Sequence, residues 1–376
     1  MSRRIGIVCY PTIGGSGVVA TELGIFLAEQ GYDVHFISTT MPFRLKRLYP
    51  NIYFHEVEVA NYPVFKHPPY DLSLANKIAE VVDREELDII HAHYAVPHAI
   101  CALFAKQMTN RDVKVVTTLH GTDITVLGID DSLQKMIRFA IEESHAVTAV
   151  SHSLKQQTED VFQTQAHIDV IHNFIDVHER SFESDEQLKR DLGLEPEEKV
   201  LIHISNFRKV KRVDQVVESF YHISQHVKSK LLLVGDGPEY SKVRQQVLDY
   251  GLDQNVIFLG RQDNIQDLIK ISDLKLLLSE KESFGLVLLE AMSQGVPCIG
   301  TNIGGIPEVI QDGVNGYICP LGDLACVSSK AIQLLQDEQL WQQQSEQAKN
   351  TVLHDFQTKH IVKQYEDLYE HVLKKD

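Results

Sequence analysis

The feature that most constrains the fold of this chain is an alternation of short apolar, often β-branched runs with helix-like stretches, which occurs in two series. Turn residues bound most runs, and the first series contains Ile5–Tyr10, Val34–Ser38, Ile89–Ala92, Val113–Leu119 and Ala146–Val150. The second series contains Val200–Ile204, Lys230–Val234, Val256–Leu259, Leu274–Leu278 and Val296–Gly300. Strands that alternate with helices form parallel sheets covered by helices. The sequence therefore predicts the α/β class, with two such domains in series.

The length of 376 residues is enough for two domains that each bury a core. A polar, charge-rich passage at Asp176–Lys199 separates the two series. We place the first domain at residues 1–172, the second at 173–355, and a C-terminal helix at 356–376. That helix carries apolar residues at steps of three to five, which is typical of an amphipathic helix.

The composition excludes several classes of protein. Hydrophobic residues make up 43% of the chain, and Gly and Pro together number only 33, so the chain is neither collagen-like nor disordered. A net charge of −16 argues against a nucleic-acid partner. The apolar run Ala99–Ala105 is too short to cross a membrane. Five scattered cysteines without a Cys-x-x-Cys predict neither a disulfide framework nor a zinc site, so we expect a cytoplasmic protein. The sequence leaves assembly into a homo-oligomer open.

A glycine-rich loop follows the first predicted strand, with the sequence Gly14-Gly15-Ser16-Gly17-Val18-Val19-Ala20. Glycines let the backbone approach a ligand, and the helix that follows offers amide donors to an anion. A tight turn without a ligand is the alternative. The loop also imitates a dinucleotide-binding fingerprint, but such a site needs an acid after the second strand, and Val34–Thr40 ends in hydroxyl residues.

Two charged segments follow strands of the second domain. Ser205–Arg212 contains four cations directly after a predicted buried strand, where a sheet of this kind would hold a diphosphate. Glu280–Ala291 combines a strand end, a Gly-containing turn and a helix, with Glu282 before the helix and Glu290 about two turns inside it. The alternative for Ser205–Arg212 is a solvated basic face. The alternatives for the two acids are that Glu282 only stabilises the helix dipole and that Glu290 is an exposed helix residue.

These motifs together resemble those of the retaining glycosyltransferases of family four. The resemblance spans essentially the whole chain, and its further landmarks are His172-Asn173-Phe174-Ile175-Asp176, Val234-Gly235-Asp236-Gly237-Pro238 and Asn302-Ile303-Gly304-Gly305-Ile306-Pro307-Glu308. It implies a GT-B fold, in which two Rossmann-like domains face each other across a cleft and the last helix crosses back to the first domain. By this resemblance the first domain binds the acceptor and the second binds a UDP-sugar.

The resemblance implies a donor site made of Gly15, Asn206, Arg208, Lys211, Arg261, Glu282, Phe284, Gly285, Leu286 and Glu290. In this site Glu290 would hold the ribose, Lys211 the diphosphate, and Glu282 the sugar hydroxyls. Backbone groups would complete it, with Gly15 at the β-phosphate, Phe284 and Gly285 at the sugar and Arg261 at the uracil. Relatives usually carry arginine where this chain has Asn206, so phosphate charge would come from Lys211, with Arg208 as a candidate helper.

The implied catalytic residues are His120, Lys211 and Glu282, without a metal or a cofactor. The chain contains no Asp-x-Asp, the metal-holding signature of the other large fold class of sugar-nucleotide transferases. His91 and His93, with His98 nearby, suggest metal ligands, but no acid with convergent spacing accompanies them. His120 ends a strand and precedes a glycine, as an active-site residue of this fold does, and a buried structural histidine is the alternative.

The segment Cys9–Leu23 is similar to the opening of those family members that transfer N-acetylglucosamine from its UDP derivative to L-malate. This resemblance implies the same two substrates here. Ser16, Tyr94, Thr118 and Thr122 are the candidate acceptor ligands, because each lies in the glycine-rich loop or follows a strand. Two alternatives are a transferase of the same fold with a sugar, inositol phosphate or lipid acceptor, and a sugar-nucleotide-binding protein without activity.

Overall fold

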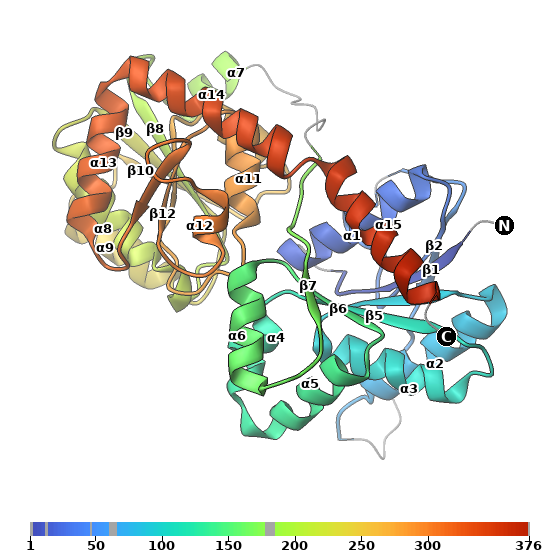
Figure 1. The fold of residues 1–376 in the computed structure, drawn as a ribbon. Helices are drawn as coiled ribbons and strands as arrows, with labels where there is room; N and C mark the ends of the chain where they lie inside the picture. The colour runs from blue at the N-terminus through green and yellow to red at the C-terminus, as the bar shows by residue number, and fades with distance from the viewer. Residues whose placement is uncertain (1–2, 12–13, 46, 60–65, 177–184, 375–376) are drawn as a thin grey trace. The chain divides into compact units, whose positions relative to one another are not determined.

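The computed structural model describes residues 3–11, 14–45, 47–59, 66–176 and 185–374. The chain divides into two compact units, of which unit 1 comprises Met1–Phe174 and Thr358–Asp376, and unit 2 comprises Ile175–Gln357 (Figure 1). The boundaries expected from the sequence, after residues 172 and 355, lie two residues before these divisions. Unit 1 therefore contains both ends of the chain, and unit 2 is one continuous segment.

Unit 1 is a seven-stranded parallel sheet in the order β3-β2-β1-β4-β5-β6-β7. Its strands are β1 (Arg4–Val8), β2 (Asp33–Ser38), β3 (Ile52–Glu56), β4 (Ile89–His93), β5 (Lys114–Leu119), β6 (Ala146–Ala149) and β7 (Ile168–Val170). Its helices are α1 (Gly15–Glu29), α2 (Tyr70–Glu85), η1 (Ala95–Ala99), α3 (Ile100–Met108), α4 (Thr122–Thr125), η2 (Leu127–Ile129), α5 (Asp131–Glu143), α6 (His152–Phe162) and α15 (Thr358–Lys374). Within unit 1, α15 lies along α1 (Figure 1).

Unit 2 is a six-stranded parallel sheet in the order β10-β9-β8-β11-β12-β13. Its strands are β8 (Lys199–Ile204), β9 (Ser229–Val234), β10 (Val256–Gly260), β11 (Leu274–Leu277), β12 (Cys298–Thr301) and β13 (Gly316–Cys319). Its helices are α7 (Asp185–Asp191), η3 (Lys209–Lys211), α8 (Val213–Ser224), α9 (Tyr240–Asp249), α10 (Gln266–Lys270), α11 (Leu286–Ser293), α12 (Ile306–Val309), α13 (Leu324–Gln336) and α14 (Glu338–Asp355). Both units are Rossmann-like, as the sequence predicted.

Burial on both faces explains why the central strands are nearly continuous apolar runs. In unit 2, Leu274 and Leu276 of β11 belong to a core that also contains Leu201 of β8 and buried residues of α8, α9 and α13. Leu277 lies on the opposite face, against α11, and is equally buried. Parallel strands covered on both sides have no exposed face that could carry alternating polar residues. No helix among the described residues is long and apolar enough to span a membrane.

The sequence did not predict β3, β7 and β13, which are all edge strands. β3 and β7 are partly exposed, and β3 carries polar residues in its sequence Ile-Tyr-Phe-His-Glu. β13 is mostly buried but only four residues long. The sequence predicted no disulfide framework, and the described residues contain a single bonded pair, Cys319 with Cys326. Cys319 ends β13 and Cys326 lies in the first turn of α13, so a short turn brings together two cysteines whose spacing gave no signal.

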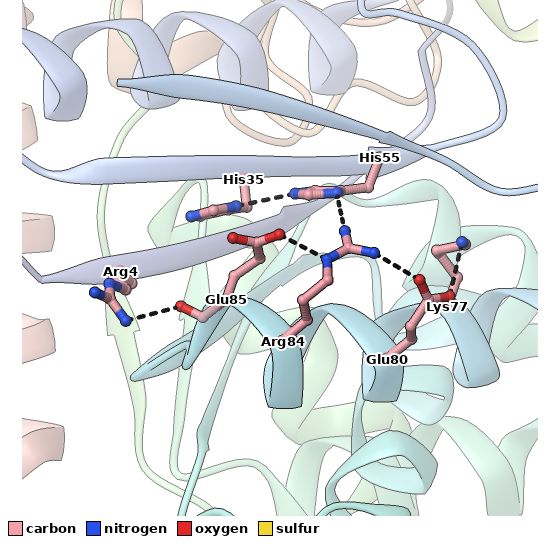
Figure 2. Close-up of polar contacts among 7 residues, drawn as sticks. All are labelled: Arg4, His35, His55, Lys77, Glu80, Arg84 and Glu85. Atoms are coloured by element: carbon pink, nitrogen blue, oxygen red, sulfur yellow. Dashed lines mark hydrogen bonds and ion pairs between the residues drawn. The ribbon is translucent and has the colours of Figure 1, made fainter. Parts of the chain in front are cut away.

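Unit 1 contains a directed hydrogen-bond network between its sheet and α2 (Figure 2). Arg84 donates to Nδ1 of His55 at 3.0 Å, and Nε2 of His55 lies 2.9 Å from Nδ1 of His35. Because a guanidinium only donates, His55 must carry its proton on Nε2 and donate it to His35. Arg84 also pairs with Glu80 and Glu85, both at 2.7 Å. The network therefore requires both imidazoles to be neutral.

We expect the stability of the protein to fall as pH drops from about 6.5 to about 4. Burial lowers the pKa of His35 from 6.5 to about 4, with a further contribution from His55. In this pH window the unfolded chain takes up a proton that folded His35 does not, so acid favours unfolding. Above pH 6.5 this contribution is fully present.

Urea unfolding of the wild type and of His35→Asn across this window tests the assignment. The variant should be less stable at pH 7 and should lose less stability on acidification. Equal slopes for the two proteins would show that His35 does not contribute.

Candidate active site

The donor-site candidates of unit 2 lie beyond the carboxyl ends of its strands. Asn206, Arg208 and Lys211 follow β8, Arg261 follows β10, and the segment that begins at Glu282 follows β11. Because all strands are parallel, these segments emerge at one edge of the sheet. β8 pairs with β11, while β9 and β10 lie on the other side of β8. The strand order therefore changes direction between β8 and β11, which makes this position the topological switch point of unit 2.

An ion pair joins the two segments at the switch point. Lys211 Nζ lies 2.7 Å from Glu282 Oε2, and the two side chains are only 20% and 15% exposed. The Glu280 amide donates to the Val210 carbonyl at 2.8 Å, which ties the two loops together next to the pair. Lys211 is therefore held at the sheet edge by a carboxylate and by the fold of its loop. An ammonium in this position can neutralise a bound phosphate.

Glycines allow the neighbouring loops to approach the backbone of these segments. Gly304 has φ +57°, and a Cβ at this residue would lie 1.8 Å from the Glu282 carbonyl oxygen. The Gly305 amide donates to the same oxygen at 3.1 Å. Gly235 has φ +123°, and its Cβ would lie 1.8 Å from the Ser205 carbonyl oxygen. Two motifs singled out in the sequence thus support the loops that carry Glu282 and Asn206.

Glu290 is a buried carboxylate within α11, and its residue is only 5% exposed. The helix begins at Leu286 after Gly285, which adopts φ +93°. Glu290 lies a little more than one turn inside the helix, where the sequence had suggested about two, because the chain reaches helical geometry only after Gly285. Phe284 is also buried and packs edge-on against Phe356 at 5.7 Å. The exposed-acid alternative for Glu290 is therefore wrong.

The remaining donor-site candidates differ in exposure. Arg208 and Asn206 are exposed, and Arg261, directly after the last residue of β10, is exposed as well. None of the three makes a side-chain contact that would fix it among the described residues. Arg208 could therefore swing toward a ligand. Its role as a replacement for the arginine that relatives carry at the position of Asn206 remains a proposal.

Two buried basic residues beneath this edge were missed by sequence analysis. His203 of β8 is fully buried and contacts the Ser205 hydroxyl at 2.8 Å, and burial lowers its pKa to about 3. Lys275 of β11 is also fully buried, and burial lowers its pKa to about 7. Both lie inside strands, where the sequence pattern indicates only core. The signal that could have found them is a polar residue inside an otherwise apolar strand sequence.

The acceptor-site candidates of unit 1 lie at the corresponding switch point, between β1 and β4. Ser16 is in the first turn of α1, and Tyr94 directly follows β4. The Tyr94 hydroxyl donates to Ser16 Oγ at 3.0 Å, and both side chains are partly exposed. Tyr94 adopts φ +90°, a strained value for a residue other than glycine. Gly15 is exposed beside Ser16, and Thr12 and Ile13 of the same loop lie outside the described residues.

His120 and Thr122 complete this edge. His120 Nε2 lies 2.9 Å from His93 Nδ1, and the His120 ring lies 5.1 Å from that of Tyr94. Burial and the nearby His98 lower the pKa of His120 to about 3, so it is neutral at pH 7. Thr122 is exposed. Asp123, which sequence analysis missed, is buried and accepts from the Ala95 and Gly121 amides, which fixes the loop that carries Thr122.

Thr118 differs from the other acceptor candidates because its side chain is fully buried. Its hydroxyl lies 2.7 Å from His91 Nε2 and 2.7 Å from the Thr148 hydroxyl. Thr118 lies inside β5, one residue before its end, and does not follow the strand. A direct contact with an acceptor would require its hydrogen bonds to rearrange. His91 also uses its second nitrogen, which lies 2.7 Å from the Tyr369 hydroxyl. The pair His91 and His93 is thus engaged with protein groups.

Comparison with known proteins gives the family. Residues 184–351 match the model of group 1 glycosyl transferases, and residues 13–179 match that of glycosyltransferase family 4. The chain is 57% identical over 376 residues to the N-acetyl-alpha-D-glucosaminyl L-malate synthase of Bacillus anthracis, covering 100% of this chain and 99% of that protein. The chain belongs to glycosyltransferase family 4. This family 4 member is a glycosyltransferase, and the family resemblance inferred from its motifs is confirmed.

Solved structures support the fold of this family 4 glycosyltransferase. A glycosyltransferase from Rickettsia africae superposes with a TM-score of 0.82 at 23% identity, covering 100% of both chains. HepE of Anabaena, solved with UDP-glucose, superposes with a TM-score of 0.82 at 21% identity, covering 98% of this chain and 99% of that chain. The two Rossmann-like units are those of the GT-B fold.

We expect Gly304→Ala to destabilise unit 2 by at least about 3 kcal/mol. The left-handed backbone alone costs an alanine about 1 to 2 kcal/mol, and the clash with the Glu282 carbonyl adds to it. Gly313→Ala is a matched control, because Gly313 has φ +75° and no atom near its Cβ position. Urea unfolding should therefore show a much smaller loss for Gly313→Ala. Equal losses of unfolding free energy in the two variants would mean that the loop around Gly304 can move to accommodate the Cβ without destabilising unit 2.

Proposed function

We propose that this chain transfers N-acetylglucosamine from UDP-N-acetylglucosamine to the hydroxyl of L-malate, with retention at the anomeric carbon. The observation that carries the proposal is the 57% identity, over essentially the full length of both chains, to the Bacillus anthracis L-malate synthase described above. Such a reaction would be the first step of bacillithiol biosynthesis and would take place in the cytoplasm. The proposal includes independence from metals.

The donor would bind at the switch point of unit 2. Lys211 is a partly buried cation that can hold the diphosphate, and Glu282 beside it can accept hydrogen bonds from the sugar hydroxyls. Glu290 is a buried carboxylate suited to two adjacent ribose hydroxyls. HepE, which shares the fold, was solved with UDP-glucose. The Gly285 and Leu286 backbone, at the start of α11, offers amide donors to the sugar.

In the reaction, the malate hydroxyl oxygen would form a bond to the anomeric carbon as the bond from that carbon to the β-phosphate oxygen breaks. The leaving phosphate oxygen would take the hydroxyl proton on the same face, so retention needs no enzyme nucleophile. The protein would orient both substrates and stabilise the charge that develops on the diphosphate. His120, neutral because of its burial, would orient the donor sugar or its phosphate.

The acceptor would bind at the glycine-rich loop and the adjacent strand ends of unit 1. Ser16, Tyr94 and Thr122 offer partly or fully exposed hydroxyls, and the N-terminus of α1 offers amides to a carboxylate. Thr118 would act from behind these groups, because its own hydroxyl is buried and hydrogen-bonded.

A mass-spectrometric assay with UDP-N-acetylglucosamine and a panel of acceptors tests the function. L-malate should give a product with the mass of N-acetylglucosaminyl malate, ahead of D-malate, lactate, inositol phosphate and neutral sugars. Preference for inositol phosphate or a sugar would reject malate as the acceptor and retain the glycosyltransferase. UDP-sugar binding without any product would favour the non-catalytic alternative.

Lys211→Ala should lower turnover by about a hundredfold to a thousandfold. Removal of one preorganised group that stabilises developing charge costs roughly 2.7 to 4 kcal/mol in the transition state. Lys209→Ala is the matched control, because Lys209 lies in the same short helix η3 and is exposed. Steady-state kinetics should show near-normal turnover for the control. Near-normal turnover of a folded Lys211→Ala protein would reject the role of Lys211.

Exhaustive chelation should leave activity unchanged. Lys211 and the N-terminus of α11 can stabilise the leaving diphosphate, and the chain lacks the Asp-x-Asp that holds a metal in other transferases. Initial rates measured with and without EDTA, after removal of divalent ions, provide the test. Loss of activity that a divalent cation restores would show that a metal takes part.

A further inference from the structure

A buried chain of hydrogen bonds links the last helix of unit 1 to the central strands of its sheet. The Tyr369 hydroxyl on α15 lies 2.7 Å from His91 Nδ1, and His91 Nε2 lies 2.7 Å from the Thr118 hydroxyl on β5. All three residues are fully buried. Tyr369 and His91 are 278 residues apart in sequence, so the fold alone brings them together.

The direction of these bonds follows from burial. Burial lowers the pKa of His91 to about 3 and raises that of Tyr369 well above its ordinary value, so both groups are neutral. Among the described residues, the Tyr369 hydroxyl hydrogen-bonds only His91. An undonated buried O–H costs free energy, so Tyr369 donates to Nδ1 of His91. The His91 proton is then on Nε2 and is donated to Thr118.

This series of hydrogen bonds leads from Tyr369, through His91 and Thr118, to the candidate acceptor site. The Thr118 carbonyl accepts from the Tyr94 amide at 2.9 Å, and the Tyr94 hydroxyl donates to Ser16 at 3.0 Å. Tyr94 has a strained backbone with φ +90°, which a fixed hydrogen-bond partner helps to hold. His91 thus fixes the side chain of Thr118, and the Thr118 carbonyl holds the Tyr94 amide. If the His91 ring lost its orientation, Tyr94 and Ser16 would both be held less firmly.

We infer that Tyr369 is a positioning residue for the acceptor, acting through His91 and Thr118 on Tyr94 and Ser16. The inference rests on the proposed function, because the acceptor is what Tyr94 and Ser16 would bind. Tyr369 contacts no substrate in this role. It fixes the tautomer of His91, and the tautomer fixes which way the Thr118 hydroxyl is held.

Steady-state kinetics of Tyr369→Phe with UDP-N-acetylglucosamine and L-malate test the inference. The variant keeps the buried ring and loses only the donor O–H. The malate KM should rise about three- to tenfold, while the donor KM and the UDP affinity measured by calorimetry stay within twofold. Tyr32→Phe is the control, because Tyr32 lies against Glu366 of the same helix and has no bond to His91. It should leave both KM values unchanged.

A second pair of variants separates hydrogen bonding from packing. His91→Gln keeps an N–H at the position of Nε2, so it should raise the malate KM less than His91→Leu does. Nitrogen-15 NMR of wild-type His91, identified by loss of its signals in His91→Gln, should show the Nε2–H tautomer. Tyr369→Phe should shift this population toward Nδ1–H.

The outcomes separate the two proposals. An active wild type whose Tyr369→Phe variant has an unchanged malate KM would overturn the role of Tyr369 alone. Equal rises in both KM values, or an Nδ1–H tautomer in the wild type, would also overturn it and leave the proposed function standing. A wild type that glycosylates no hydroxy acid would reject the proposed function, and the role of Tyr369 with it.

Discussion

The arrangement of the candidate site depends on the pairing of parallel strands at two switch points. In unit 2, β8 pairs with β11, and in unit 1, β1 pairs with β4. In open parallel sheets, ligands bind at such positions, beyond the carboxyl ends of the two strands. Hydrogen-bonded side chains lie across each switch point, among them Lys211 with Glu282 and Tyr94 with Ser16. Residues more than seventy positions apart thus meet because their strands do.

Neutral histidines, most of them fully buried, form a second recurring element. Burial lowers the pKa values of His91, His98, His120 and His203 to about 3 or 4, so none carries charge at pH 7. A neutral imidazole has one donor and one acceptor nitrogen, which lets it pass hydrogen-bond direction from one partner to the next. This property orients polar groups without adding ionised residues to the core of an acidic protein.

Burial explains which parts of the fold and of the candidate site the sequence could predict. Central strands such as β5 and β8 are apolar because both faces are covered, and they were predicted nearly to the residue. Edge strands such as β3 and β7 were not, because partial exposure admits polar residues. Among the site candidates, strand ends located Lys211, Glu282 and Tyr94. The burial of Thr118 and its link to Tyr369 could not be predicted, because they depend on contacts between segments far apart in sequence.

The division of the chain also bears on the order in which it can fold during synthesis. Unit 1 contains the first 174 residues, but α15, which supplies the buried Tyr365 and Tyr369, leaves the ribosome only after all of unit 2. Until then the polar nitrogens of His91 lack one partner, and the apolar surface that α15 covers is open to water. Unit 2 is continuous and needs nothing beyond Gln357. Unit 2 can therefore complete its core before unit 1, which starts first but must wait for α15.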